Sequence, residues 1–182
     1  MSVLSSKWMI YLLALVVGSI VGGCYGALHN QISYSVSSEY FTLFKFKQFN
    51  LPWAYEQPRL GAAWVGVMAS WWMGLLLAAV LGLVGLRSKD TARMARLLAQ
   101  SFTLVLVTAL AVGLWGLWSA QRAVTLATID DYRAWVVSGA LDPVAFVQAG
   151  FMHNASYTGG VAGLAVGVVY LWWRTRKPNS LI

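Results

Sequence analysis

The chain has 182 residues, of which 59% are hydrophobic and only 10% are charged, and it contains a single cysteine. A soluble domain is usually about 25% charged, so a globular protein of this composition would have too few charged side chains to cover its surface in water. The same composition excludes a disordered chain, and one cysteine excludes a small disulfide-stabilised scaffold. The remaining class is an all-α integral membrane protein, with residues 1–182 forming one transmembrane domain.

Four apolar segments are long enough to cross a bilayer as helices. A span needs roughly 20 apolar residues, because the hydrocarbon core is about 30 Å thick and a helix rises about 1.5 Å per residue. The segments cover approximately residues 8–28, 60–86, 97–119 and 155–173. They are too long for β-barrel strands and lack the alternation of such strands. The sequence therefore predicts a four-helix transmembrane bundle with outer loops 29–59 and 120–154, which contain short interfacial helices, and an inner loop 87–96.

The basic residues are distributed unequally between the two sides of this bundle. Eight of the 13 Lys and Arg residues, with one of the six acids, lie near the chain termini or in the loop 87–96. The other side has as many acids as bases. Since short cytoplasmic loops are enriched in Lys and Arg, both termini and the inner loop should be cytoplasmic. This bias also explains the sequence pI of about 9.8, so we expect the lipid bilayer as a partner and no nucleic acid.

The first span has a second interpretation. Lys7, the apolar run 8–20 and the sequence Val-Gly-Gly-Cys ending at Cys24 resemble a bacterial lipoprotein signal. Cleavage there would remove the first helix and leave Cys24 as a lipidated residue. The alternative is a retained helix, because the apolar run continues to Leu28 and reaches the length of a full span. An intact-mass measurement distinguishes the two.

Small residues spaced four apart mark the faces on which membrane helices approach closely. Such stripes occur in the first span (Gly18, Gly22, Gly26), the second (Gly66, Ser70, Gly74, Ala78, Gly82) and the fourth (Gly159, Gly163, Gly167), whereas the third has only Ala109 and Gly113. We therefore expect the first, second and fourth helices to meet most tightly.

The two histidines lie at the outer ends of the first and fourth spans. With about 100° per residue, His29 falls within roughly 20° of the glycine stripe of its helix, and His153 projects near the small-residue face of its own. If these faces pack, the two imidazoles approach each other. Together with Glu39 they would suit a divalent transition metal, or they could act as an acid–base pair. The plain alternative is that each histidine only forms hydrogen bonds at a helix end.

Aromatic residues indicate two further features. Trp71 and Trp72 fall near the middle of the second span, where one of them could form the wall of a ligand site or both could pack against lipid. The stretch 39–49 mixes aromatics with lysines, so it should lie at the outer interface or fold over the mouth of the bundle as a lid. Asp142 and Pro143 form a favourable helix start, and a short helix is expected over 128–139.

Four segments together resemble a family of uncharacterised bacterial four-span membrane proteins. They are His29-Asn-Gln-Ile-Ser, Glu39-Tyr-Phe-Thr, Ala69-Ser-Trp-Trp-Met-Gly-Leu75 and His153-Asn-Ala-Ser-Tyr-Thr-Gly-Gly160. The chain departs from the family pattern at Asn30, where Asp is frequent, and at Ser70, where Thr is usual. No activity is attached to the family, and the resemblance implies a location in a bacterial inner membrane. The resemblance implies that a set of residues acts together, namely His29, Gln31, Glu39, Tyr40, Trp72 and His153.

These observations predict an outward-facing site that binds a metal ion or a small ligand. The expected metal ligands are His29, His153 and Glu39, and the expected cofactor-binding residues are Trp72, Tyr40 and Gln31. An alternative is a non-catalytic structural or accessory subunit of a larger membrane complex, whose glycine faces and aromatic loop dock other membrane subunits. A membrane-embedded enzyme is a third possibility, although the sequence has no P-loop, zinc-protease or dinucleotide motif.

Overall fold

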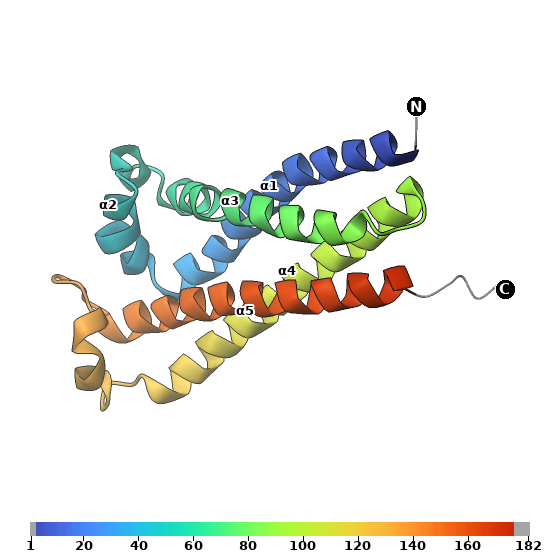
Figure 1. Ribbon diagram of the computed structural model, residues 1–182. Helices are drawn as coiled ribbons and strands as arrows, with labels where there is room; N and C mark the ends of the chain where they lie inside the picture. The colour runs from blue at the N-terminus through green and yellow to red at the C-terminus, as the bar shows by residue number, and fades with distance from the viewer. Residues whose placement is uncertain (1–2, 177–182) are drawn as a thin grey trace.

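The computed structural model describes residues 3–176 and shows an elongated bundle (Figure 1). Four helices in this range are long and apolar enough to cross a membrane: α1 (Val3–Val36), α3 (Pro58–Gly85), α4 (Thr91–Ala123) and α5 (Pro143–Arg176). No β-strand occurs among the described residues. The predicted all-α, four-helix architecture is confirmed, and the chain is a multi-pass membrane protein.

The helices extend beyond the apolar segments from which they were predicted. α1 continues to Val36, and α5 begins at Pro143, where the Asp142 carboxylate accepts a hydrogen bond from the Ala145 amide at 3.0 Å. Both histidines therefore lie inside helices rather than in loops. At the other end, α4 begins at Thr91 and shortens the predicted inner loop. Polar residues can continue a helix past the hydrocarbon layer once a cap satisfies its first amides.

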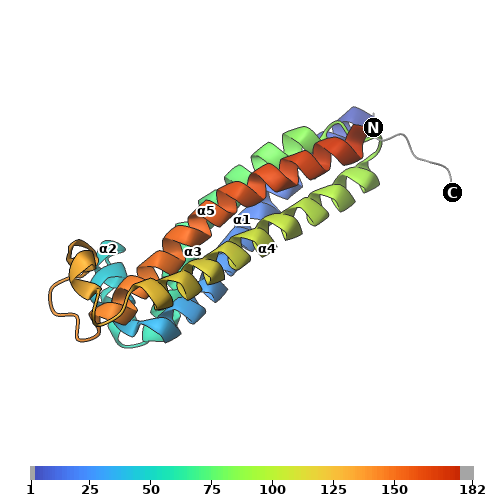
Figure 2. The ribbon, with the colours of Figure 1, turned by 90° about the horizontal axis from the view of Figure 1, so that it is seen from below.

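The bundle consists of two tightly packed helix pairs, α1 with α3 and α4 with α5 (Figures 1 and 2). A Cβ added at Gly22 of α1 would lie 2.7 Å from the Ser70 carbonyl oxygen and 2.8 Å from the Gly74 Cα of α3. On α5, a Cβ added at Gly163 would lie 2.9 Å from the Val105 Cα of α4. The expectation that the first, second and fourth helices meet most tightly is therefore wrong for the fourth, whose stripe packs on the third.

The reason for this difference lies on α4. Its packing face has small or β-branched residues at Val105, Ala109 and Gly113. These side chains leave the backbone of Val105 and Ala109 exposed, so the α5 glycines Gly163 and Gly159 lie directly against it. One partner with a continuous glycine stripe is sufficient for close approach if the other has no bulky side chain on the facing surface. Counting glycines on each helix separately missed this pairing.

The segment between α1 and α3 folds over the outer end of the bundle. It comprises a wide helical turn η1 (Tyr40–Lys45), the short helix α2 (Phe46–Gln48) and the 3-10 turn η2 (Pro52–Tyr55). Tyr40, Phe41 and Phe46 are buried against the ends of α3 and α5. Of the two arrangements expected for the stretch 39–49, the structure shows the one that covers the bundle mouth. We call residues 39–55 the lid.

The α4–α5 connection reaches the same end of the molecule. It contains the 3-10 helix η3 (Ile129–Trp135), in the place where a short helix was expected. Both oxygens of the Glu39 carboxylate accept hydrogen bonds from backbone amides just before α5, those of Leu141 and Asp142, at 2.9 to 3.1 Å. Glu39 thereby joins the lid to the start of α5.

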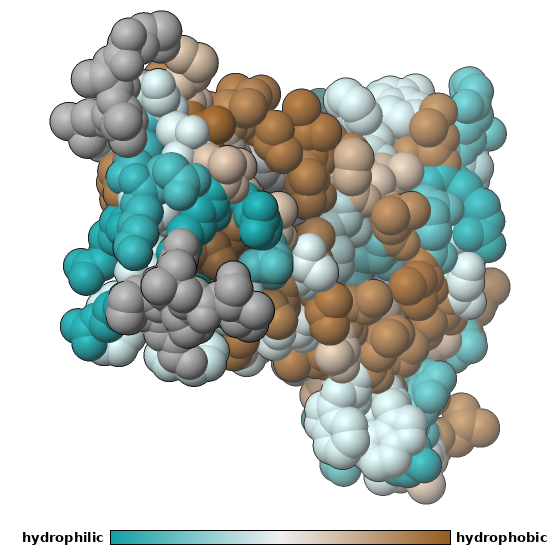
Figure 3. Space-filling model, turned by 90° about the vertical axis from the view of Figure 1, so that its right-hand side faces the viewer, coloured by the Kyte–Doolittle hydropathy of each residue, from teal (hydrophilic) through white to brown (hydrophobic). Residues whose placement is uncertain are grey.

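The opposite end carries the start of α1, the α3–α4 turn and the end of α5. The Lys7 ammonium donates to the Ser88 carbonyl, and the Arg93 guanidinium donates to the Arg174 carbonyl at 2.8 Å. Figure 3 looks onto this end, where hydrophilic residues gather beside apolar ones. The Lys and Arg residues that were assigned to the cytoplasmic side from the sequence therefore all lie at this end of the molecule, except Lys177, which lies outside the described residues.

Candidate functional site

A cavity of about 270 Å³ lies between the two helix pairs in the outer half of the bundle. Its deep part is apolar and is lined by Ala69, Met73, Leu77, Val105, Leu106 and Ala109. All four long helices contribute to its wall, and the lid residues Lys45, Gln48 and Phe49 line its outer end. Clefts between helices of a bundle are common ligand sites, and this volume is near the lower end of their usual range of about 300–1,000 Å³. The space is suited to one small molecule.

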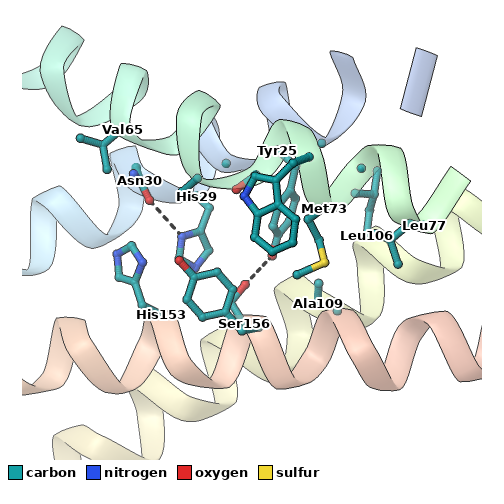
Figure 4. A pocket seen from close by; sticks show the side chains of 18 of the residues that line it. Tyr25, His29, Asn30, Val65, Met73, Leu77, Leu106, Ala109, His153 and Ser156 are labelled. Carbon is teal, nitrogen blue, oxygen red and sulfur yellow. Dashed lines mark hydrogen bonds between the residues drawn. The ribbon is translucent and has the colours of Figure 1, made fainter. Parts of the chain in front are cut away.

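The two imidazoles meet at the polar end of this cavity. The ring centroids of His29 on α1 and His153 on α5 are 5.0 Å apart, with the ring planes at 81°. Both side chains are buried, and Figure 4 shows them projecting from opposite helices into the same space. The sequence prediction that two residues 124 positions apart become neighbours is confirmed by this ring contact.

The hydrogen bonds of His29 determine which of its nitrogens is free. The Asn30 side-chain amide donates to the Ala62 carbonyl at 2.9 Å, which turns Asn30 Oδ1 towards His29 Nδ1, 3.4 Å away. Because a carbonyl oxygen can only accept, Nδ1 of the neutral ring carries the proton and Nε2 keeps a lone pair. Among the described residues this buried Nε2 has no hydrogen-bond partner. A buried polar atom without a partner is costly, so this nitrogen can accept a hydrogen bond from a donor placed in the cavity.

His153 is held by different neighbours. Its Nε2 lies 3.0 Å from the Ser33 hydroxyl of α1, which links the two helix pairs. The Tyr40 ring of the lid lies 4.9 Å from the His153 ring, tilted by 31°. Burial in this aromatic layer raises the pKa of the Tyr40 phenol, so the side chain stays neutral over the physiological range. Tyr40 therefore covers the histidine end as an uncharged side chain.

A second polar contact crosses the cavity one helical turn further in. The Tyr25 hydroxyl on α1 and the Ser156 hydroxyl on α5 are 2.8 Å apart (Figure 4). This pair separates the polar end of the cavity from the apolar part near Met73 and Leu106. The lining is thus divided along the bundle axis into a hydrogen-bonding end and a hydrocarbon-like end.

Lys45 stands at the outer mouth of the cavity. Its ammonium donates to the Gln48 side-chain oxygen at 3.0 Å, and both residues line the cavity. Lys45 also lines a separate hollow of about 390 Å³ on the outer surface, together with Tyr40 and Trp135. Partial burial lowers the pKa of Lys45, because removal from water disfavours the charged form. Among the described residues that line the cavity, none is acidic.

The structure brings together some of the predicted site residues and separates others. His29, His153 and Trp72 line the cavity, and Tyr40 lies against His153. Glu39 was predicted as a third metal ligand, but its carboxylate is bonded to the backbone amides before α5.

Gln31 is also outside the cavity. Its amide donates to the Arg59 carbonyl at 3.0 Å and joins α1 to the start of α3. Within residues 3–176, no three His, Cys, Asp or Glu side chains form a group that could hold a metal. The predicted six-residue set is therefore divided between a cavity and two helix-joining contacts.

Several cavity residues were not singled out from the sequence. Tyr25 lies four positions before His29, and Tyr157 lies four after His153. Ser33, which contacts His153 but does not line the cavity, lies four after His29. Residues four apart share one face of a helix, so this spacing was a usable signal once the histidines were identified. Lys45 gave no such signal, because its position depends on the fold of the lid.

No protein-family model matches this chain, and neither a curated protein nor a solved structure is significantly similar to it. The resemblance to a bacterial four-span family stays a prediction. The function must be argued from the geometry of the site.

Proposed function

We propose that this membrane protein binds a small amphipathic molecule in the cavity between its helix pairs, with the polar group of the molecule at the histidine end. The observation that carries the proposal is the buried, unpartnered Nε2 of His29 at the polar end of a cavity whose other end is apolar. A hydroxyl on the ligand would donate to this lone pair, while its apolar part would replace the missing packing atoms along the deeper wall.

The shape of the cavity supports a single-chain molecule. The lining runs along α3 from Val65 to Leu77, twelve residues, or about 18 Å at about 1.5 Å per residue. The lining reaches the molecular surface at Trp72 and Tyr157, which are 43% and 44% exposed. These aromatics belong to α3 and α5, so the ligand would enter from the bilayer between the two helix pairs.

The orientation and location follow the sequence prediction. Seven of the twelve Lys and Arg residues within 3–176 lie at the end with the α3–α4 turn, together with one acid, whereas the other end has five bases and five acids. This imbalance supports a cytoplasmic placement of both termini, and the resemblance to a bacterial four-span family supports an inner membrane. The cavity would then open in the outer half of the bilayer.

A photoreactive fatty alcohol tests the proposal in protein reconstituted in phosphatidylcholine nanodiscs. Labelling of cavity residues such as Met73 and Leu106, located by peptide mass spectrometry, is expected. Gly160 lines the cavity and a Cβ there would meet no atom within 4 Å, so Gly160→Leu should fill the space and reduce labelling. Val161→Leu is the matched control, because Val161 is 66% exposed on the outer surface of the same helix. Equal labelling in both variants would refute the proposal.

Removing the polar partner provides a second test. His29→Phe keeps a ring of similar size and removes the free nitrogen, so the fatty alcohol should bind roughly tenfold more weakly, the loss of one buried hydrogen bond of about 1 kcal/mol or slightly more. If His29→Phe binds the fatty alcohol as well as the wild type does, His29 is not part of the site. The proposal that the cavity binds the ligand would then be decided by the Gly160→Leu result.

The metal hypothesis is a separate candidate, favoured by the 5.0 Å approach of the two imidazole rings. Two nitrogen ligands are fewer than the three protein ligands of an open zinc site, so the ligand or solvent would have to complete the coordination. Metal analysis of the wild type, His29→Ala and His153→Ala decides this: equal content in all three counts against it. Co-purification of a larger complex under mild detergent would instead favour the accessory-subunit alternative.

A further inference from the structure

Resting on the proposed function, we infer that the ligand carries a negatively charged head group, which the Lys45 ammonium holds at the outer mouth of the cavity. The class of ligand is therefore a single-chain anionic amphiphile. An alkyl phosphate monoanion fits both contacts, because its P–OH can donate to His29 Nε2 while its charged oxygens accept from Lys45; a fatty-acid carboxylate pairs with Lys45 but only accepts and leaves that nitrogen without a donor. The juxtaposition of Lys45 and Gln48 with an apolar cavity behind them assigns this class.

The Lys45 ammonium has unused hydrogen-bonding capacity at this position. It has three donors, and the structure shows one of them on the Gln48 oxygen. Within residues 3–176 the only ion pair closer than 4.0 Å is Arg133 with Asp130, so no carboxylate neutralises Lys45. The rings of Phe44 and Tyr40, with centroids 4.6 and 5.5 Å from Nζ, give a weaker attraction. An anion is the missing counterpart.

The surroundings of Lys45 suit a head group better than a buried charge. Among the residues that the structure describes, Lys45 is the only Lys or Arg lining the cavity, and it also borders the outer hollow beside Tyr40 and Trp135. A head group at this boundary can keep water on its outer side, which limits the desolvation cost of pairing two charges. Because the pair would be partly buried, salt would screen the attraction between its charges less than at the open surface.

The depth of the cavity selects the rest of the molecule. Beyond the Tyr25–Ser156 contact the lining changes to Met73, Leu77 and Leu106, which leave no charged group for a second polar moiety. The volume of about 270 Å³ accommodates one chain rather than the two chains of a phospholipid. A free inorganic anion would leave this apolar part empty.

Competition against the photoreactive fatty alcohol tests the inference in phosphatidylcholine nanodiscs. The competitors are dodecyl phosphate, dodecanoate, dodecanol and inorganic phosphate. In the wild type we expect dodecyl phosphate to compete about tenfold more strongly than dodecanol, the gain expected for a charge-assisted contact. Dodecanoate should fall between the two, because its carboxylate cannot donate to His29 Nε2, and inorganic phosphate should not compete. The relative strength of the two anions distinguishes a phosphate from a carboxylate head group.

Two substitutions assign the preference to Lys45. Lys45→Met keeps the length of the side chain and should bring both anions to the level of dodecanol, whereas Lys45→Arg should retain the preference. Lys47→Met removes the same charge from an exposed lid position that does not line the cavity, so it should behave as the wild type.

The outcomes separate this inference from the proposed function. If the alcohol labels the cavity but the anions show no advantage, or if Lys47→Met abolishes the advantage as fully as Lys45→Met, the inference is overturned and the cavity proposal stands. Competition by inorganic phosphate at the concentration of dodecyl phosphate would also overturn it, since the chain would then contribute nothing. Absence of any cavity labelling refutes the proposed function itself.

Discussion

Replacing Gly22 by alanine tests the close packing of α1 on α3. The new Cβ would lie 2.7 Å from the Ser70 carbonyl oxygen and 2.8 Å from the Gly74 Cα, whereas ordinary contact begins at 3.4 Å. The helices would have to separate by about 0.7 Å, and a gap of that size forfeits about a quarter to a half of each dispersion contact along the seam.

The expected loss can be compared with a neighbour on the same helix. Overpacking costs about 1–3 kcal/mol, and replacing a helical glycine by alanine returns about 0.5–1 kcal/mol, so Gly22→Ala should lower the free energy of unfolding by about 1–2 kcal/mol. A Cβ at Gly23 would lie 3.5 Å from Val67 Cγ1, an ordinary contact, so Gly23→Ala should be neutral or slightly stabilising. Unfolding of both variants in dodecyl sulfate mixed micelles, followed by circular dichroism, measures the difference. Equal stability of the two variants would refute the packing argument.

Three further predictions address contacts that join separate elements. Tyr25→Phe and Ser156→Ala should each destabilise the bundle. Their double-mutant cycle should give a coupling energy of about 0.6–1.7 kcal/mol, from the average to the maximum measured for hydrogen bonds between membrane helices. A coupling energy of zero would contradict the 2.8 Å contact between the two hydroxyls. Glu39→Ala should speed hydrogen exchange at the Leu141 and Asp142 amides about tenfold, because a carboxylate acceptor worth more than about 1.4 kcal/mol is lost, while the Arg93 amide, capped by Asp90, stays unchanged as a control. Above about pH 10 the unfolded chain releases the Tyr40 proton, whereas the folded protein retains it, because burial raises the pKa of this phenol. The free energy of unfolding should therefore fall by up to about 1.4 kcal/mol per pH unit from this group, and it should fall less steeply in Tyr40→Phe. Identical slopes for the two proteins would exclude Tyr40 as the cause.

The hydrophobic segments and the histidine contact could be predicted because they depend on local rules. Length and composition identify a span without reference to its neighbours, and the angle between His29 and the α1 glycine stripe follows from helix geometry alone. The His153 ring contacts the His29 ring, although the prediction that the α5 glycine stripe packs on the first and second spans was wrong. The imidazoles converge because both helices border the central cavity, not because their glycine stripes pack on each other.

The roles of Glu39 and Lys45 could not be predicted, because both depend on how the lid turns. A carboxylate ten residues after His29 suggests a metal ligand, yet the lid directs Glu39 to the Leu141 and Asp142 amides just before α5, where the start of a helix favours negative charge. Lys45 was one of two lysines in an aromatic stretch, and the sequence gives no reason to prefer it over Lys47. Only the buried anchors Phe41 and Phe46 determine which lysine faces inward.

The division of the bundle into α1 with α3 and α4 with α5 has a consequence for biogenesis. Each pair joins spans that are consecutive in the chain, so the first pair can assemble as soon as its second helix leaves the insertion machinery, before the other half has been synthesised. The cavity between the pairs, which is lined by residues of both halves, is then the last part of the molecule to form. Truncation after residue 90 should accordingly yield a membrane-inserted, packed helical hairpin that has no such cavity.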